Sequence, residues 1–222
     1  MTKYNKKYFE YQKLIGSKNK NIAHRFNKYI NSNSVVLDFG CGGGYLLDLF
    51  NCKSKIGIDI NEEALIYAKN KGISTYSSIE YVEDESIDVV VSNSVLGHLS
   101  NPYETLMEIK KKMKINSFII FSVPHETINW NYKKNEINYK FFTWSPMALG
   151  NLFHNVGFDI IKVNTYKEIA FPFELRLNNK FIFKILNLIR PAYRLFRIIL
   201  DELKIYRIAI DGNLVIYARR SK

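Results

Sequence analysis

The sequence predicts an α/β fold in which a mostly parallel sheet is covered by helices on both faces. Short apolar runs of strand length alternate with amphipathic helical patterns along most of the chain, and this alternation is typical of βαβ units. A glycine-rich bend, residues 40–44, directly follows the first apolar run. Ligands of such sheets bind beyond the carboxyl ends of the strands. The bend is therefore the first candidate for a functional site.

The amino-terminal half begins with the apolar run 34–39, which predicts a buried strand, and residues 45–51 are expected to continue the bend as a helix. The next helix, 61–72, has Asn61 as its N-cap and Gly72 just past its end. These residue types are the preferred ones at the two ends of a helix. Further apolar runs predict strands at 55–60, 73–77 and 86–93.

The carboxyl-terminal half adds two helices with clear starts. Pro102 falls at the first helical position of 101–114, where its missing N–H costs nothing. Ser145 is the expected N-cap of the helix 145–157. Strands are expected at 117–124, 158–166 and 212–220, and a long aromatic loop at 125–144.

The length of 222 residues suits one domain with elaborations. We expect a helical cap at 1–33, the main domain at 34–222, and a basic helical insertion within it at about 167–211. No stretch resembles a signal peptide, and no apolar run is long enough to span a membrane. Two cysteines do not make a disulfide framework. We therefore expect a cytoplasmic protein with reduced thiols.

Positive charge is concentrated on two flanks. The net charge is +11, with +7 in residues 1–30, +6 in 176–208 and −4 in 31–175. Such flanks attract an anionic substrate, a nucleic acid or an anionic membrane, although solvated surface lysines would give the same composition. Within 176–208 the basic residues repeat at helical spacing opposite apolar ones. This segment is expected to cap the active site, to form a dimer face or to contact a membrane peripherally.

The glycine bend differs from a dinucleotide-binding fingerprint. That fingerprint is G-x-G-x-x-G, whereas Gly40, Gly42 and Gly44 follow G-x-G-x-G. Asp38 precedes the first glycine, where a carboxylate would repel a pyrophosphate but suit an amino group. Asp59 ends the second strand and is placed to bind both hydroxyls of a ribose. The inferred ligand has a ribose and a cationic amino-acid end but no phosphates.

These residues carry a family resemblance. "VLDFGCGGG" and "IGIDI" resemble the first two motifs of the class I S-adenosylmethionine-dependent methyltransferases. "DESIDVVVSNSVLGHLSNP" and "FTWSPMALGNLFHNVGFDI" continue the resemblance in order, over about 34–166 and the last strand. The resemblance implies a Rossmann-like seven-stranded sheet in the order 3-2-1-4-5-7-6, with the last strand antiparallel. It also implies S-adenosylmethionine as cofactor, S-adenosylhomocysteine as product, and no metal.

The cofactor-binding residues that the resemblance implies lie in the loops after the first four strands. The glycines let the backbone lie against the cofactor, one aspartate holds its amino-acid end, and the other takes its ribose hydroxyls. Three further residues border the adenine, and two lie near the methionine. In that order the set is Gly40, Gly42, Gly44, Asp38, Asp59, Ile60, Ser78, Ile79, Ser92 and Asn93.

Two histidines are candidates for acid–base catalysis of methyl transfer. His98 follows the fourth strand in "VLGHL", and His125 follows the fifth in "VPHE". Each could be a general base for a protic acceptor, and each could instead bond loop backbone. If the acceptor oxygen is an ionised phosphoryl oxygen, no base is needed and the histidines would orient or neutralise the acceptor. The loop 125–144 is long enough to form a lid over the acceptor.

We expect an O-methyltransferase acting on a small acceptor. The chain resembles bacterial enzymes of surface-polysaccharide and capsule pathways, and its basic flanks suit an anionic sugar nucleotide, saccharide, phosphoryl or phosphoramidate group. An RNA methyltransferase is one rival, but the chain lacks N/D-P-P-Y after the fourth strand and a cysteine after the fifth. Nucleic acid is therefore not the expected partner. A non-catalytic fold that binds the cofactor or a partner enzyme is the other rival, and oligomerisation stays open.

Overall fold

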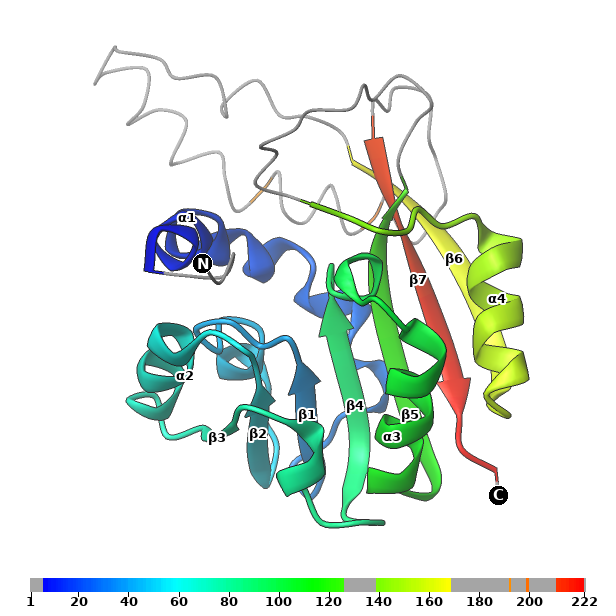
Figure 1. The fold of residues 1–222 in the computed structure, drawn as a ribbon, viewed down its shortest axis with the longest axis horizontal. Helices are drawn as coiled ribbons and strands as arrows, with labels where there is room; N and C mark the ends of the chain where they lie inside the picture. The colour runs from blue at the N-terminus through cyan, green and yellow to red at the C-terminus, as the bar shows by residue number, and fades with distance from the viewer. Residues whose placement is uncertain (1–5, 126–138, 169–191, 193–198, 200–210, 222) are drawn as a thin grey trace.

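The computed structural model describes residues 6–125, 139–168, 192, 199 and 211–221. Its strands are β1 Val35–Phe39, β2 Ser54–Ile58, β3 Ser74–Tyr76, β4 Ile87–Asn93, β5 Met113–His125, β6 Asp159–Glu168 and β7 Asp211–Arg219. They form one sheet in the order β3-β2-β1-β4-β5-β7-β6 (Figure 1). Strands β1 to β5 pair in parallel, whereas β7 runs antiparallel to both β5 and β6. The predicted Rossmann-like fold and strand order are confirmed.

The register of the parallel strands brings the two predicted aspartates to one edge of the sheet. Asp38 is aligned with Gly57 of β2 and with Val91 of β4. Asp59 directly follows β2, and Asn93 is the last residue of β4. Because parallel strands end at the same edge, the loops after β1, β2 and β4 meet there.

Within the described ranges the α-helices are α1 Lys6–Gly16, α2 Glu62–Lys69, α3 Pro102–Lys112 and α4 Pro146–Asn155. The predicted N-caps are present. The Asn61 side chain accepts hydrogen bonds from the backbone N–H groups of Glu63 and Ala64, and the Ser145 hydroxyl accepts one from Ala148. After α1 the chain continues in short 3₁₀ helices at Ser17–Asn21, Ala23–Arg25 and Asn27–Tyr29.

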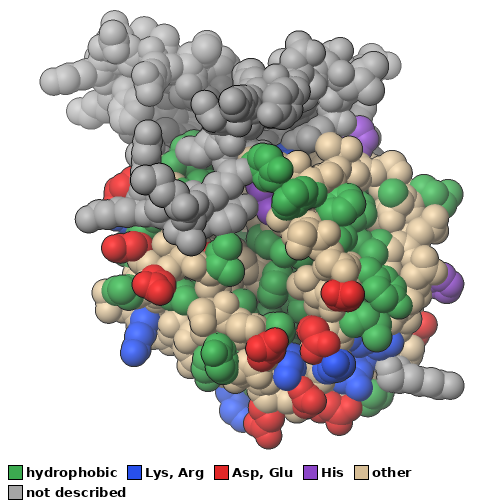
Figure 2. Space-filling view, in the orientation of Figure 1, with side chains coloured by type: hydrophobic (Ala, Val, Ile, Leu, Met, Phe, Trp, Pro, Cys, Tyr) green, Lys and Arg blue, Asp and Glu red, His purple; other side chains and the backbone are tan. Residues whose placement is uncertain are grey.

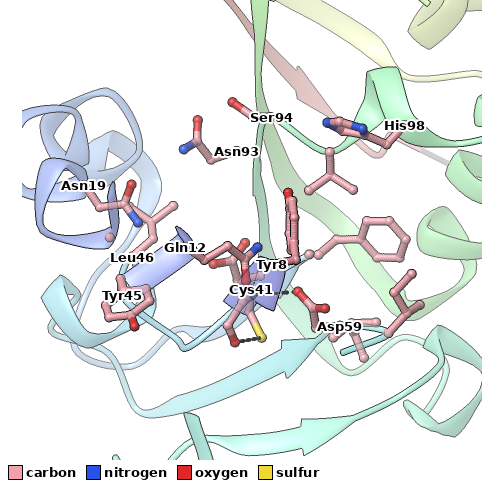
Figure 3. Close-up of a pocket in the computed structure, with 18 of the residues that line it drawn as sticks. Tyr8, Gln12, Asn19, Cys41, Tyr45, Leu46, Asp59, Asn93, Ser94 and His98 are labelled. Atoms are coloured by element: carbon pink, nitrogen blue, oxygen red, sulfur yellow. Dashed lines mark hydrogen bonds between the residues drawn. The ribbon is translucent and has the colours of Figure 1, made fainter. Parts of the chain in front are cut away.

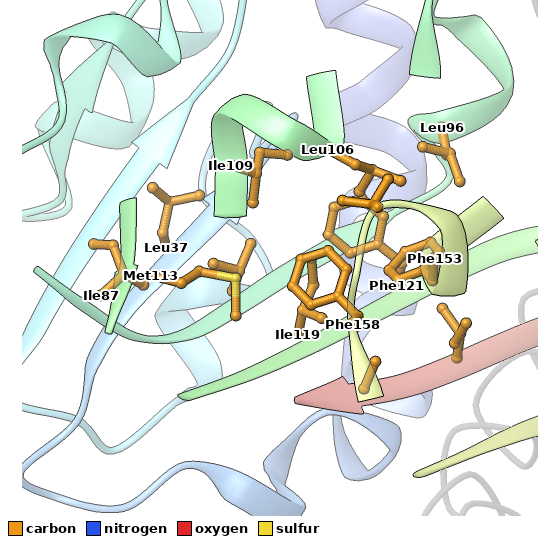
Figure 4. Packing of buried hydrophobic residues seen from close by; sticks show 14 of the residues in the cluster. Leu37, Ile87, Leu96, Leu106, Ile109, Met113, Ile119, Phe121, Phe153 and Phe158 are labelled. Carbon is orange, nitrogen blue, oxygen red and sulfur yellow. The ribbon is translucent and has the colours of Figure 1, made fainter. Parts of the chain in front are cut away.

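Alternate residues of the central strands enter two separate hydrophobic layers. Leu37 packs into the layer covered by α3 and α4 (Figure 4), whereas its neighbour Val36 packs into the layer on the opposite face. In the first layer the rings of Phe121 and Phe153 meet edge to face, with centroids 5.6 Å apart. The side-chain period of two thus explains why these strands are apolar at nearly every position.

The helix predicted at 45–51 is not formed. In its place the chain makes turns and a short 3₁₀ helix at Leu47–Leu49. The turn follows Gly44, whose φ of 72° is in the left-handed region, and it ends at Phe50, whose backbone is already extended. Leu46, Leu47 and Phe50 are buried, so the apolar spacing reflects core packing of a compact turn.

Figure 2 shows acidic and basic side chains mixed at the lower end of the molecule, where β4 and β5 begin. Lys112 pairs there with Asp84 at 2.5 Å, and Lys114 pairs with Asp88 at 2.8 Å. No described helix is long and apolar enough to cross a membrane. Most of the basic segment 176–208 and the loop part 126–138 lie outside the described residues, so their predicted roles stay predictions.

We expect Asn61→Ala to lower the free energy of unfolding by about 1 kcal/mol, because it removes the cap of α2. Asn61 is buried and accepts two backbone hydrogen bonds. Urea unfolding would measure the loss, with Asn51→Ala, at an exposed position, as the control. Equal stability of the two variants would show that the cap contributes nothing.

Candidate functional site

A cavity of about 390 Å³ lies at the carboxyl ends of β1, β2 and β4 and is bounded by α1 (Figure 3). This volume falls in the range of small-molecule sites. Seven of the residues predicted from the sequence line it, namely Asp38, Gly40, Gly42, Asp59, Ile60, Asn93 and His98. The fold therefore brings together residues that are up to sixty positions apart in the chain.

The glycine bend is held against the end of β2 by backbone hydrogen bonds. The N–H groups of Gly40 and Cys41 both donate to the Ile58 carbonyl oxygen, at 2.7 and 2.9 Å. Gly40 has a φ of 80°, and a Cβ there would lie 2.2 Å from Val95 Cγ2. A side chain at this position would be both strained and obstructed, so the close approach of the bend to the cavity requires glycine.

Asp59 is fixed by the backbone around it. Its Oδ2 accepts a hydrogen bond from Gly42 N at 2.8 Å, and its Oδ1 accepts one from Asn61 N at 2.9 Å. Burial raises the pKa of Asp59, while these backbone donors lower it. Each carboxylate oxygen can accept a second hydrogen bond. The oriented carboxylate is thus suited to a pair of ligand hydroxyls.

Asp38 is a buried carboxyl group in the wall of the cavity. It is 3% exposed, and its buried Oδ1 has no hydrogen-bond partner among the residues that the structure describes. Burial raises the pKa of Asp38 to about 8, and repulsion by Asp59 adds to the rise. An unpaired buried carboxylate is costly. A ligand ammonium beside Asp38 would supply the missing donor and charge, so the site fits a cationic amino-acid end.

The first helix supplies residues that the sequence reasoning did not name. Tyr8, Tyr11 and Gln12 of α1 line the cavity, at the steps of three and four that place residues on one helix face. The helix is seated by Phe9, whose ring meets that of Tyr67 with centroids 5.6 Å apart. Polar and aromatic residues at this helical spacing could have indicated that one face of α1 contacts a ligand. The sequence did not show that α1 packs against the glycine bend.

The cavity is also lined by His98, Asn93 and Lys140, and Figure 3 shows His98 and Asn93 on the side of the cavity away from Asp59. His98 Nδ1 lies 2.5 Å from the backbone carbonyl oxygen of Tyr139. A carbonyl oxygen only accepts, so Nδ1 carries the proton, and in the neutral ring Nε2 carries the lone pair. This tautomer is the one that can take a proton from a ligand. Lys140 was not predicted as a site residue, because no sequence signal separates it from other loop lysines.

Five predicted site residues do not line the cavity. Two of them, Ser92 and Gly44, pack beneath the residues that line it. Ser92 is buried and its hydroxyl donates to the Phe39 carbonyl oxygen at 2.7 Å, which joins β4 to β1. A Cβ on Gly44 would lie 2.3 Å from Ile73 Cδ1, so this glycine packs against the core.

The other three lie outside it altogether. Ser78 caps the 3₁₀ helix Ile79–Tyr81, and Ile79 belongs to the hydrophobic layer under α3. His125, the last residue of β5, is paired with Gly212 of β7. A loop position read from a motif can be off by a turn, because the sequence does not show how each loop bends. Their contacts with a ligand stay predictions.

The chain was compared with known proteins. A family model described as "Methyltransferase domain" matches residues 9–163. The ubiquinone biosynthesis O-methyltransferase of Aliivibrio fischeri is 31% identical over 110 residues, which are 44% of this chain and 45% of that protein. The chain thus spans less than half the length of the curated relatives it matches.

Solved structures share the fold. A SAM-dependent methyltransferase from Archaeoglobus fulgidus matches with a TM-score of 0.59 and 21% identity, over 94% of both chains. Phosphoethanolamine N-methyltransferase 2 of Haemonchus contortus, in complex with phosphomonomethylethanolamine and S-adenosylhomocysteine, has a TM-score of 0.62 and 14% identity, over 97% of this chain and 57% of that one. At these identities the likeness concerns the fold alone. Within the described ranges no cluster of His, Cys, Asp and Glu could hold a metal ion.

We expect Asp38→Asn to stabilise the ligand-free protein at pH 8. The folded pKa of about 8 lies above the unfolded value of about 3.9, so stability falls as the pH rises between the two values. Asparagine stays neutral and avoids this fall. The variant should exceed the wild type by more than about 1.4 kcal/mol at pH 8, the value of one pKa unit, and by much less at pH 5.

Urea unfolding at the two pH values measures this difference, with Asp48→Asn at an exposed carboxyl as the control. Asp59 is present in every protein compared, so its own titration cancels to first order. Parallel pH dependence of wild type and Asp38→Asn would show that Asp38 is not the buried carboxyl that titrates.

We expect Gly40→Ala to weaken S-adenosylhomocysteine binding by about tenfold or more, or about 1.4 kcal/mol. Gly72→Ala is the matched control, because Gly72 has a similar φ of 77° but open space around its Cβ position. Both variants should lose about 1–2 kcal/mol of stability from backbone strain, and only Gly40→Ala should also lose affinity. Calorimetric titration measures binding, and unchanged affinity in Gly40→Ala would contradict the assigned role of the bend.

Proposed function

The chain belongs to the methyltransferase-domain family whose model it matches over residues 9–163, and from this premise we propose that it transfers the methyl group of S-adenosylmethionine to an oxygen atom of a small acceptor. The observation that carries the proposal is the division of one cavity into two ends. One end holds the unpaired carboxylate of Asp38 together with the fixed carboxylate of Asp59. The other holds His98 in a tautomer that can accept a proton.

The acidic end has the groups that the cofactor needs. Asp38 Oδ1 would accept a hydrogen bond from the cofactor ammonium, and the Asp59 carboxylate would accept those of the ribose hydroxyls. Ile60 lines the cavity and is 68% exposed, so an adenine ring would cover an apolar side chain that otherwise faces water. Gly40 and Gly42 let the backbone approach, and Asn93 lies toward the methionine. Gly44 and Ser92 would act by holding the bend and β4 in place.

When bound, S-adenosylmethionine would supply its sulfonium methyl group to the acceptor oxygen and leave as S-adenosylhomocysteine. His98 Nε2 takes the proton of the attacking hydroxyl, while the Nδ1 hydrogen bond to Tyr139 keeps the ring oriented. Tyr8 and Gln12 of α1 line the cavity and would shield the bound cofactor from water. Positioning of the two reactants contributes on the order of 7–11 kcal/mol to such a step, and the base contributes a further factor of about 10²–10⁴.

The proposal also concerns the class of acceptor that receives the methyl group. Transfer to oxygen is supported by relatives that are O-methyltransferases, among them the ubiquinone biosynthesis O-methyltransferase of Aliivibrio fischeri. A surface-polysaccharide acceptor, such as a sugar nucleotide, is supported by the charge of the sequence and by its resemblance to enzymes of such pathways. Quinone precursors and sugar nucleotides therefore both belong in a first acceptor panel.

The decisive experiment follows S-adenosylhomocysteine release by mass spectrometry. Purified protein is incubated with S-adenosylmethionine and separate pools of sugar nucleotides, phosphoryl compounds, quinone precursors, acyl acids and total RNA. Turnover with one small-molecule pool, lost in Asp59→Ala, supports the proposal. Turnover with RNA alone contradicts it, and cofactor binding without turnover in any pool favours the non-catalytic alternative.

We expect His98→Gln to lower kcat by about 10²–10⁴-fold without changing the affinity for S-adenosylhomocysteine. The amide preserves a polar side chain of similar size but cannot take up the proton. His154→Gln, at an exposed position of α4, is the control. His125→Gln should behave like the control, because His125 does not line the cavity. A larger loss of kcat in His125→Gln than in His98→Gln would show that His98 is not the base.

A further inference from the structure

The segment 139–142, which we call the strap, is pinned beside the cavity by bonds to two consecutive residues. The N–H groups of Phe141 and Phe142 both donate to the Gly97 carbonyl oxygen, at 2.8 and 3.2 Å. His98 Nδ1 donates to the Tyr139 carbonyl oxygen at 2.5 Å. These bonds join the end of the loop after β5 to the 3₁₀ helix Leu96–His98, which follows β4. The strap is therefore a fixed part of the cavity wall.

Gly97 allows the strap to lie this close. A Cβ at Gly97 would lie 2.9 Å from the Phe142 carbonyl oxygen and 3.7 Å from Lys140 Cδ. The first distance is too short for any side chain, and the strap backbone would have to move. The aliphatic stem of Lys140 therefore runs over Gly97, and its side chain enters the lining of the cavity.

The charges of the cavity lining are separated along it. Among the described lining residues the carboxylates are Asp38 and Asp59, and Lys140 is the one lysine or arginine. Both carboxylates belong to the end that suits a cationic ligand. Lys140 follows Tyr139, whose backbone is bonded to His98, and its stem lies against Gly97, which precedes His98. We therefore assign Lys140 to the end of the cavity that holds His98. The half-buried setting strengthens an ion pair relative to one on the open surface.

We propose that Lys140 is a specificity-determining residue, which selects acceptors that carry an anionic group next to the hydroxyl deprotonated by His98. The inference rests on the proposed function. The tautomer of His98 suits a protic hydroxyl as nucleophile, whereas an ionised phosphoryl oxygen would need no base. The anionic group is then the handle by which the acceptor is held, and the neighbouring hydroxyl is the atom that is methylated.

The test uses paired probes, in which one member carries an anionic group and the other is neutral. One pair is 3,4-dihydroxybenzoate and its methyl ester, and the other is glucose 1-phosphate and methyl glucoside. Calorimetric titration measures their affinity for the protein saturated with S-adenosylhomocysteine. Wild type should bind the anionic member of at least one pair about tenfold or more tightly than its neutral partner, as expected for one well-placed charge-assisted contact. The pair that shows the preference identifies the anion as a carboxylate or a phosphate.

Lys140→Met keeps the apolar stem and should abolish this preference. Lys53→Met, which removes the same charge at an exposed position before β2, should keep it. Gly97→Ala should reproduce the loss through displacement of the strap. The inference is overturned if wild type binds no probe or binds the anionic and neutral members of each pair equally. It is also overturned if Lys140→Met keeps the preference for the anionic probe.

Failure of this inference is distinct from failure of the proposed function. Affinity for S-adenosylhomocysteine is measured first in each protein, without any acceptor. A wild type that does not bind S-adenosylhomocysteine contradicts the proposed function itself. A wild type that binds it with full affinity but shows no charge preference contradicts only the role of Lys140.

Discussion

The architecture of the site depends on the attachment of the glycine bend to the end of β2. The N–H groups of Gly40 and Cys41 donate to the Ile58 carbonyl oxygen. The N–H of Gly42, the next residue, donates to Asp59 Oδ2. We call these three hydrogen bonds the seam. This seam is possible because Gly40 has no side chain to meet Val95. It places Asp38 and Asp59 on the wall of one cavity, so the cofactor end of the site is built into the sheet.

The seam also has an electrostatic cost. Two carboxylates share a poorly solvated space, and burial together with mutual repulsion raises the pKa of Asp38 to about 8. Without a ligand this arrangement works against stability at neutral and basic pH. A cationic ligand would relieve it, and binding to the folded state alone would stabilise the protein. Strain of this kind is expected at a binding site and is rare elsewhere in a fold.

Two segments far apart in the chain complete the cavity. Helix α1 closes the end that holds the aspartates, and the strap 139–142 closes the end that holds His98. Neither belongs to the seven strands, yet each is seated by specific contacts, Phe9 on Tyr67 for the helix and the Gly97 carbonyl oxygen for the strap. The sheet thus carries the two aspartates, and the two added segments carry Tyr8, Gln12 and Lys140 to the same cavity.

The sequence by itself predicted the strands, the helix caps and seven residues that line the cavity, because those features are local, whereas the strand order came from the family resemblance. Apolar runs, caps such as Asn61, and the Asp38 and Asp59 positions at strand ends all depend on near neighbours in the chain. Local rules failed at 45–51, where the chain forms a compact turn and Phe50 is already extended. Ser78, Ile79 and His125 do not line the cavity, so their contacts with a ligand stay predictions. Only the tertiary structure placed His98 rather than His125 at the cavity, together with Gln12 and Lys140. Those choices depend on contacts between segments that no local pattern records.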